Sequence, residues 1–372
     1  MSRLGSMGAR LYRGEVGYDF VAKRRIWYGI SILITITAIV GLAVRGLNLG
    51  IEFQGGAVFT TTQSTSVSVE HAQDSAEKLS GHDATVQKLG NGGIRIQVSG
   101  IGTGTADKIH DSLAKELNLP VDKIAADVVG PSWGETIANK AWEGLAIFMV
   151  LVVVYLAIAF EWRMALAALV ALIHDLTITV GIYALVGFEV TQGTVIGLLT
   201  ILGYSLYDTV VVFDGLKEAS KDIRKQTRFT YSEIANRSLN GTLVRSINTT
   251  VVALLPVAGL LFIGGGFLGA GMLNDISLAL FVGLAAGAYS SIFIATPLVA
   301  DLKERDPAMK ALKKRVLAKR AAAAKADPAG RDGDGAEPQD DVPGTPAPAG
   351  AVAGSRRPPA PRGRGRTQGK RR

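Results

Sequence analysis

Two charged residues within apolar stretches of the sequence are the leading candidates for chemistry. Asp208 lies in the stretch that ends at Asp214, and Arg245 lies near the start of the next apolar stretch. An ionised side chain at the centre of a membrane-spanning helix costs on the order of 3 kcal/mol, so such residues are functional hypotheses by default. We predict that Arg245 can reach Asp208 and that the two form a proton relay.

Three other polar residues are secondary candidates for the same role. Asp214 lies close to the end of its apolar stretch, where an interfacial carboxylate needs no special explanation. His174 and Asp175 are adjacent and lie about midway along a different apolar stretch. Neighbouring residues of a helix point about 100° apart, so these two side chains cannot share one partner.

Each leading candidate also has a purely structural explanation. The long side chain of Arg245 lies near a helix end, from which it can place its guanidinium among the lipid head groups at little cost. Asp208 can be a structural carboxylate that is held by Arg, Ser or Thr partners. The sequence alone leaves both alternatives open.

No catalytic or cofactor-binding motif accompanies these residues. The sequence has no Walker pattern, no cluster of zinc ligands and no nucleophile elbow, and it contains no Cys. We therefore expect a protein that is not an enzyme and that needs neither a metal nor another cofactor.

The stretches that must position the candidates are long enough to cross a membrane. The 372 residues are 48% hydrophobic and have a mean hydropathy of +0.27, which is more apolar than an ordinary soluble domain. Because a spanning helix needs about 20 apolar residues, we predict an α-helical polytopic membrane protein with six transmembrane helices. The predicted spans are residues 26–44, 137–160, 164–186, 191–216, 243–263 and 276–299.

The first and last spans have features of their own. The apolar run at 26–44 is longer than the roughly 7 to 15 residues of a signal-peptide core, so we interpret it as a retained anchor. The last span is expected to end near Pro297, because proline does not easily continue a helix.

The distribution of Lys and Arg predicts the orientation in the membrane. Basic residues near the ends of short loops stay on the cytoplasmic side, and here they concentrate in the segment 1–25, in the loop 217–242 and after the last span. We therefore predict that both termini are cytoplasmic and that residues 45–136 are external.

The predicted external segment, 45–136, is long enough to fold as a small domain. Its pattern predicts strands at 58–62, 84–89, 94–98 and 124–129 and helices at 69–79 and 106–117. The order β-α-β-β-α-β suggests a ferredoxin-like α+β domain, which by itself says nothing about function.

The C-terminal segment 303–372 is rich in Ala, Pro, Gly, Arg and Lys, so we predict a basic, disordered cytoplasmic tail. Its Arg-rich end has the charge to bind nucleic acid or anionic lipid head groups. The simpler interpretation is a solvated tail that reinforces the topology, and we do not expect nucleic acid as a partner.

Several motifs together resemble a known family over residues 20 to 303. They are Gly50-Ile51-Glu52-Phe53-Gln54-Gly55-Gly56, Val129-Gly130-Pro131-Ser132, Ile173-His174-Asp175, the stretch from Gly203 to Asp214, Asn236-Arg237-Ser238, Thr242-Leu243 with Arg245, and Tyr289-Ser290-Ser291-Ile292-Phe293. With them the sequence resembles the SecF membrane subunits of the bacterial Sec protein translocase, in the SecD/SecF family of the resistance-nodulation-division superfamily. Two positions depart from the family pattern: Glu52 stands where Asp is usual, and Gly215 stands where a basic residue is common.

The resemblance implies a place in the bacterial cytoplasmic membrane and a set of partners. SecD, of matching six-span design, would form a twelve-helix unit with this chain beside the SecYEG channel, with SecA and YajC-type subunits as further partners. Unfolded preprotein would be the substrate, and membrane lipids would surround the spans. The proton motive force would drive late, ATP-independent stages of export, with protonation of Asp208 releasing Arg245 or a carboxylate on SecD.

Two other functions stay open beside this one. The chain can be half of a proton-coupled exporter of small molecules, although such exporters normally have two large external loops and twelve spans in one chain. It can also be a passive scaffold of the translocase, in which case charge within the bilayer is dispensable.

Overall fold

The computed structural model describes residues 17–61, 67–90, 92–265 and 271–326. Within them, six helices are long and apolar enough to cross a membrane, in agreement with the predicted number. They are α2 (Arg24–Arg45), α6 (Pro131–Ala159), α7 (Trp162–Val186), α8 (Gln192–Ala219), α9 (Tyr231–Gly259) and α10 (Gly271–Ser290). The protein is therefore a mostly helical, multi-pass membrane protein.

Local sequence signals begin and end several of these helices. Pro131 occupies the first turn of α6, where its missing N–H costs no hydrogen bond. Helix α7 ends at Gly187 in the left-handed conformation, with φ 82°. Helices α8 and α9 begin with capping boxes, in which Thr191 and Thr230 accept from the backbone N–H three residues on.

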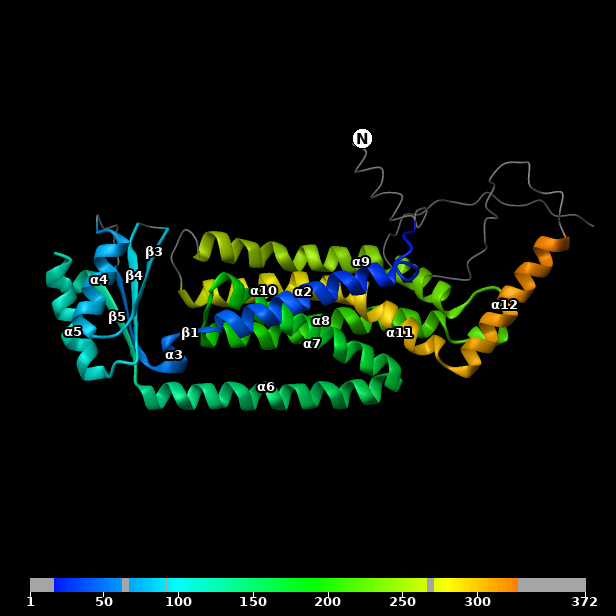
Figure 1. The fold of residues 1–372 in the computed structure, drawn as a ribbon, viewed down its shortest axis with the longest axis horizontal. Coiled ribbons are helices and arrows are strands. Elements are labelled where there is room, and N and C mark those ends of the chain that lie inside the picture. The colour runs from blue at the N-terminus through cyan, green and yellow to red at the C-terminus, as the bar shows by residue number, and fades with distance from the viewer. Residues whose placement is uncertain (1–16, 62–66, 91, 266–270, 327–372) are drawn as a thin grey trace, which may run out of the picture. The chain divides into compact units, whose positions relative to one another are not determined.

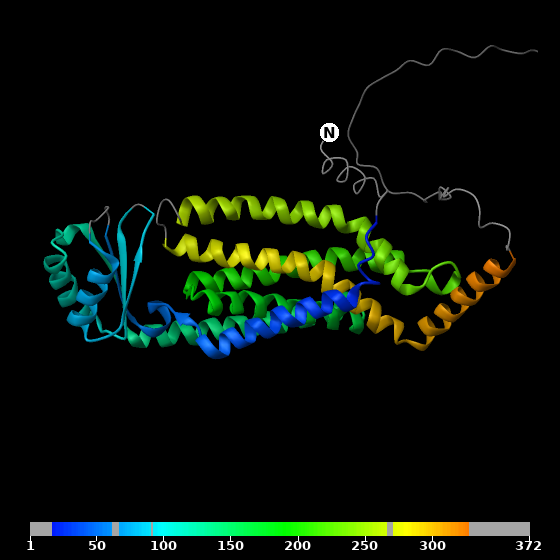
Figure 2. The same cartoon turned by 45° about the horizontal axis from the view of Figure 1, so that its top comes forward.

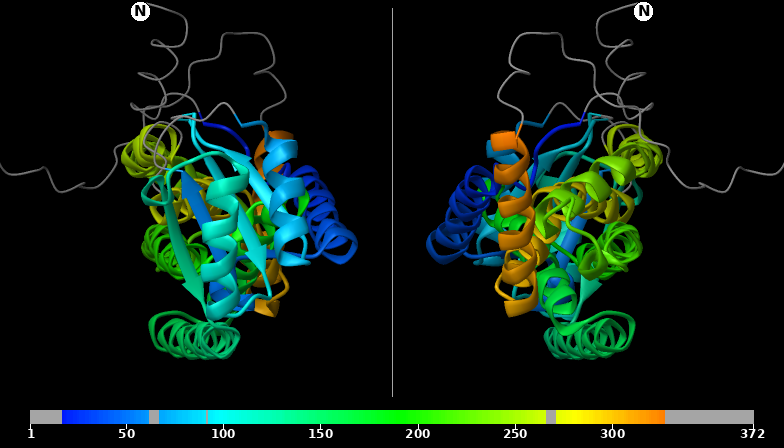
Figure 3. Two further views of the ribbon diagram at one scale, coloured as in Figure 1. Left: turned by 90° about the vertical axis from the view of Figure 1, so that its left-hand side faces the viewer. Right: turned by 90° about the vertical axis from the view of Figure 1, so that its right-hand side faces the viewer.

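Helices α7, α8 and α10 form the inside of the bundle. Helices α2, α6 and α9 lie around them on three sides (Figure 3) and expose most of their apolar surface. Small residues allow the close packing: a Cβ added to Gly181 of α7 would lie 2.2 Å from the Cβ of Ala38, and one added to Gly197 of α8 would lie 2.7 Å from the Cβ of Ala279. Such contacts let helix backbones approach closely in lipid.

The end of the last span differs from the prediction. Helix α10 passes into a π-helical segment, η4 (Ser291–Ala295), and then into α11 (Thr296–Glu304) without leaving the helical path. Pro297 does not end the span, because it lies in the first turn of α11. The wider π-helical turn before Pro297 accommodates the proline ring and its missing N–H.

Two other segments are more helical than predicted. The segment predicted as the loop 217–242 contains the end of α8, a short 3₁₀ turn η2 (Ile223–Lys225) and, from Tyr231 onward, the start of α9. The prediction of disorder from residue 303 was wrong for α12 (Pro307–Ala326). Helix α12 buries three apolar residues at near-helical spacing, which are Met309, Leu312 and Val316. The predicted disorder of 327–372 lies outside the described residues.

A small α+β domain lies at one end of the bundle (Figures 1 and 2). Its elements are β2 (Gly56–Thr61), α4 (Val69–Ser80), β3 (Ala84–Lys88), β4 (Ile94–Ser99), α5 (Thr103–Glu116), the 3₁₀ turn η1 (Val121–Lys123) and β5 (Ile124–Val129). The four strands form an antiparallel sheet in the order β3-β4-β2-β5, and α4 and α5 lie side by side on one face (Figure 3). The β-α-β-β-α-β order agrees with the sequence prediction.

Two short elements connect this domain to the bundle. Strand β1 (Asn48–Leu49) pairs in parallel with β6 (Glu189–Val190), which lies between α7 and α8. Helix α3 (Ile51–Gln54) follows β1 and packs against α6. The next residue, Gly55, has φ 75°, and a Cβ there would lie 2.6 Å from the Cα of Pro131. Only glycine fits this close, left-handed position.

Candidate functional site

Asp208 is buried inside the bundle and is held by two serines from other helices. Its side chain lies on α8, and the residue is 5% exposed. The Ser246 hydroxyl of α9 lies 2.8 Å from both carboxylate oxygens, and the Ser291 hydroxyl donates to Oδ2 at 2.5 Å. These contacts agree with the structural explanation of Asp208, in which Ser side chains hold the carboxylate. Both hydrogen-bond donors are neutral.

Arg245 does not reach Asp208 in this chain, so the predicted contact was wrong. Arg245 is exposed on α9, whereas its neighbour Ser246 faces inward to Asp208. Adjacent residues of a helix point about 100° apart, so α9 cannot present both toward α8. The exposed face around Arg245 also holds Ile247 and Asn248.

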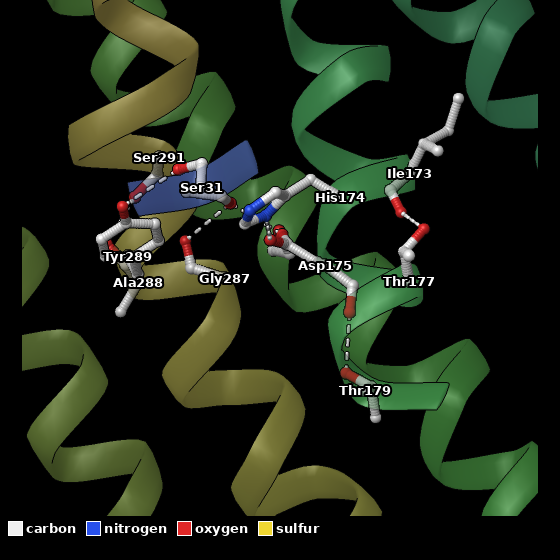
Figure 4. Close-up of polar contacts among 12 residues, drawn as sticks. Ser31, Ile173, His174, Asp175, Thr177, Thr179, Gly287, Ala288, Tyr289 and Ser291 are labelled. Carbon is white, nitrogen blue, oxygen red and sulfur yellow. Dashed lines mark hydrogen bonds and ion pairs between the residues drawn. The ribbon is translucent and has the colours of Figure 1, made fainter. Parts of the chain in front are cut away.

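Asp175 is a second buried carboxylate, on α7, and is 0% exposed. Its Oδ2 accepts from Ser205 of α8 at 2.5 Å and from Ser290 of α10 at 2.8 Å. His174 Nδ1 lies 3.4 Å from Oδ1 (Figure 4). Asp175 thus joins the three inner helices of the bundle.

His174 has a different partner on α10, as the helical geometry predicts. Its ring stacks on Tyr289, with ring centroids 6.1 Å apart and planes 25° from parallel. The Tyr289 hydroxyl lies 3.0 Å from the hydroxyl of Ser31 on α2 (Figure 4). His174 Nε2 is buried without a hydrogen-bond partner among the described residues.

The two carboxylates are linked through neighbouring serines. Ser290 donates to Asp175, and the next residue, Ser291, donates to Asp208. The two serines lie where α10 becomes the π-helical η4, and π-helical turns are frequent at functional sites. Ser205, one turn before Asp208 on α8, also donates to Asp175. A change of protonation at one carboxylate therefore acts on helices that hold the other.

Asp214 lies apart from this network. It is exposed near the end of α8. The serines are not predicted as partners by the sequence, because Ser290 and Ser291 belong to a span rich in small residues that is equally typical of helix packing. The sequence feature that marks the two serines is their adjacent position within an apolar span. In the described residues, no group of three or more His, Cys, Asp or Glu side chains has the arrangement of a metal site.

Comparison with protein families identifies two matching regions. A family model described as protein export membrane protein SecD/SecF, C-terminal, matches residues 109–305. A second model, described as the SecD/SecF GG motif, matches residues 40–62 and contains Gly55 and Gly56. These regions include Asp175, Asp208 and Arg245.

Curated relatives match along the chain. The protein translocase subunit SecF of Streptomyces coelicolor is 74% identical over the full length of both chains. The subunit SecF of Mycobacterium tuberculosis strain H37Rv is 38% identical, and the match covers 90% of this chain and 79% of the relative.

Two solved structures share the fold. The crystal structure of SecDF from Thermus thermophilus, described as a translocon-associated membrane protein, has a TM-score of 0.68 and 31% identity, and the match covers 78% of this chain and 39% of that one. A crystal structure of SecDF in a super-membrane-facing form has a TM-score of 0.58 and 31% identity, with coverage of 80% and 40%.

Proposed function

Because the chain belongs to the SecD/SecF family of protein export membrane proteins, we propose that it serves protein translocation by binding and releasing a proton at Asp208. Its relatives in Streptomyces and Mycobacterium are the protein translocase subunits SecF. The observation that supports a proton site is the buried carboxylate of Asp208, which has two serine partners and, among the described residues, no cation in contact. A proton is the ligand that such a carboxylate takes up.

Protonation changes the hydrogen bonds that Asp208 can form with its neighbours. The ionised carboxylate only accepts hydrogen bonds, whereas the protonated carboxyl also donates one. Ser291 has an alternative acceptor at hand, because its hydroxyl lies 3.3 Å from the carbonyl of Ala288. A proton at Asp208 thus releases Ser291 and allows η4 to repack against α8 and α9. One charge moved across 100 mV supplies about 2.3 kcal/mol, which is sufficient for such a shift.

Arg245 supports a partner in the membrane. It is exposed on a spanning helix and forms no ion pair within the described part of the chain. An unpaired guanidinium in a bilayer needs water, a head group or a carboxylate. We assign it a carboxylate on SecD, since relatives such as the Bacillus subtilis SecDF and the Thermus SecDF are named as one subunit containing both parts. The SecYEG channel is the further partner that this role requires.

The proposal includes an orientation of the chain in the membrane and a fold type for the α+β domain. Both termini lie in the cytoplasm, and the α+β domain lies on the external side of the bacterial cytoplasmic membrane, as the Lys and Arg distribution indicates. The domain is ferredoxin-like: its β-α-β-β-α-β order and the sheet order β3-β4-β2-β5 support this. It would contact the emerging preprotein.

The test is export in cells depleted of the wild-type protein. Asp208→Asn keeps an acceptor for Ser246 and Ser291 but cannot take up the proton, and Arg245→Met removes the charge that pairs with SecD. We expect both variants to accumulate in the membrane and to fail in proton-driven export of secreted proteins. Asp214→Asn replaces an exposed residue of the same helix and is the matched control. Cells with this variant should export normally.

Other outcomes favour the alternative functions. Normal export in cells with Asp208→Asn or Arg245→Met would favour the passive scaffold as the function of the chain. Failure of the purified chain to bring down a SecD-like subunit or the channel would favour a small-molecule exporter.

A further inference from the structure

A pair of glutamates lies where the α+β domain meets the bundle. Glu52 belongs to α3 and Glu189 to β6, at the end of α7. Arg95, on strand β4 of the domain, donates from Nη1 to Glu189 Oε2 at 3.0 Å. The Glu189 side chain is only 6% exposed. This ion pair joins the sheet of the domain to the connection between two inner helices.

Each glutamate has one oxygen without a partner. Glu52 Oε2 and Glu189 Oε1 are both shielded from solvent, and no described hydrogen-bond donor reaches them. They lie on the same side of Gly50: a Cβ added there would be 2.6 Å from Glu52 Oε2 and 2.8 Å from Glu189 Oε1. Leaving a buried acceptor unpaired is costly, and two neighbouring carboxylates do not both ionise easily. A single proton between them would relieve both costs.

The surrounding charges also favour a proton. Asp127 of β5 and Asp275 of α10 act on the same cluster, and among the described residues Arg95 supplies the opposing positive charge. Burial raises the pKa of Glu52 above its ordinary value of 4.5, and the charges of Glu189 and Asp127 add to the rise, opposed by a backbone hydrogen bond and by Arg95. A metal ion is a poor alternative, because no group of ligands in the described residues fits one.

We propose that Glu52 and Glu189 share one proton taken from the external solution, and that this proton closes a latch between the α+β domain and the membrane bundle. In the closed state the Glu52 carboxyl donates to Glu189 Oε1, and Glu189 Oε2 pairs with Arg95. When the proton leaves toward the bundle, the two carboxylates repel each other and the latch loosens. The O–H bond of the carboxyl breaks and an O–H bond forms on the water molecule that accepts the proton, so the proton is the only species transferred. The inference rests on the proposed function, in which Asp208 binds and releases a proton and the α+β domain lies on the external side.

Gly50 keeps the two oxygens close. Its N–H donates to the Val190 carbonyl at 2.8 Å, which holds β1 against β6. Its φ of −69° suits other residues, so Gly50→Ala fits the backbone. The added methyl group would lie where the two oxygens approach each other and would separate them while keeping every charge. This substitution tests proximity rather than charge.

The first measurement is infrared spectroscopy of the full chain in lipid during a pH titration. We expect the difference spectrum of wild type minus Glu52→Gln to contain the absorption of a protonated carboxyl that disappears as the pH rises. Asp122→Asn, at an exposed residue of η1 just before β5, is the matched control and should keep this band. A difference spectrum without such a band, or with a band that does not change with pH, would overturn the proposal.

The second measurement is amide hydrogen exchange of the segment 47–53 at several pH values, corrected for intrinsic exchange. In the wild type we expect exchange to accelerate by about tenfold as the proton is lost, the change that corresponds to one pKa unit of coupling. Glu52→Gln should stay slow at every pH, and Arg95→Gln and Gly50→Ala should be fast at every pH. Exchange that does not depend on pH, or that is unchanged in Gly50→Ala, would contradict the latch.

The Asp208→Asn chain separates this proposal from the proposed function. Neither measurement depends on export, so the latch should titrate in Asp208→Asn as in the wild type. Loss of the titration in that variant would show that the Glu52 site does not bind its proton independently and would count against the proposal.

Discussion

Asp175 and Asp208 are both buried carboxylates on neighbouring helices, but their surroundings differ. Asp175 has three hydrogen-bonding neighbours from the chain itself, including the ring of His174, and is completely enclosed. Asp208 has two serine partners, Ser246 and Ser291. Arg245, which directly precedes Ser246, faces away from Asp208. Asp175 thus has a ring nitrogen and two hydroxyls as neighbours within the chain, whereas Asp208 contacts only hydroxyls among the described residues. The difference suggests an anchor at Asp175 and a working site at Asp208.

The largest effect on stability should come from Asp175→Ala. The substitution removes a hydrogen-bond acceptor from three neighbours, Ser205, Ser290 and His174, although Ser290 retains the Gly287 carbonyl. Hydrogen bonds between membrane helices average about 0.6 kcal/mol each. We expect a loss of about 2 kcal/mol, measured as the free energy of unfolding in mixed micelles. Asp208→Ala should lose less, because two neighbours rather than three lose an acceptor. Equal losses would erase the distinction between anchor and working site.

The adjacent serines offer a finer comparison. Ser290→Ala and Ser291→Ala remove chemically identical hydroxyls from the same helix turn, and each should cost about 0.6 kcal/mol. Only Ser291 contacts the proposed working carboxylate, so only Ser291→Ala should also slow export. Export and unfolding measured on both variants check this split. An export defect in Ser290→Ala of equal size would place Asp175 in the proton pathway as well.

A glycine substitution disturbs the anchor alone. A Cβ at Gly287 would lie 3.0 Å from the Cβ and 3.1 Å from the hydroxyl of Ser205, which donates to Asp175. Gly287→Ala should push Ser205 aside and cost about 0.5 kcal/mol, below the full hydrogen bond because the serine can shift. Unfolding should show the loss while export by folded protein stays normal. A defect in export without a loss of stability would contradict the assignment.

The sequence predicts the number of spans and the order of the α+β domain because apolar length and periodicity are local properties. It also identifies Asp175 and Asp208, since charge in an apolar stretch is visible without a structure. The pairing of Arg245 with Asp208 failed because a shift of one residue turns a helix by about 100°, which places Ser246 there instead. The serines of α10 were not predicted as partners, because their contacts join residues 83 and 115 positions apart.

The smallest effect is expected at a half-buried surface aspartate, Asp306, which serves as the reference for the two buried ones. Asp306 pairs with Arg163 at 2.6 Å beyond the end of α11. The hydrogen bond from Arg163, with that from the Ala308 N–H, lowers the pKa of Asp306 below its ordinary value of 3.8. The pair therefore contributes stability above pH 3.8 and loses it as the pH falls through the lowered pKa.

Solvent and salt screen such a contact, so Asp306→Asn should lower the unfolding midpoint slightly at neutral pH and low salt. The difference from wild type should vanish in high salt or acid, whereas the loss in Asp175→Ala should persist in high salt, because a buried carboxylate is not screened. If both losses vanish in salt, the Asp175 network is open to water and is not the anchor that its burial implies.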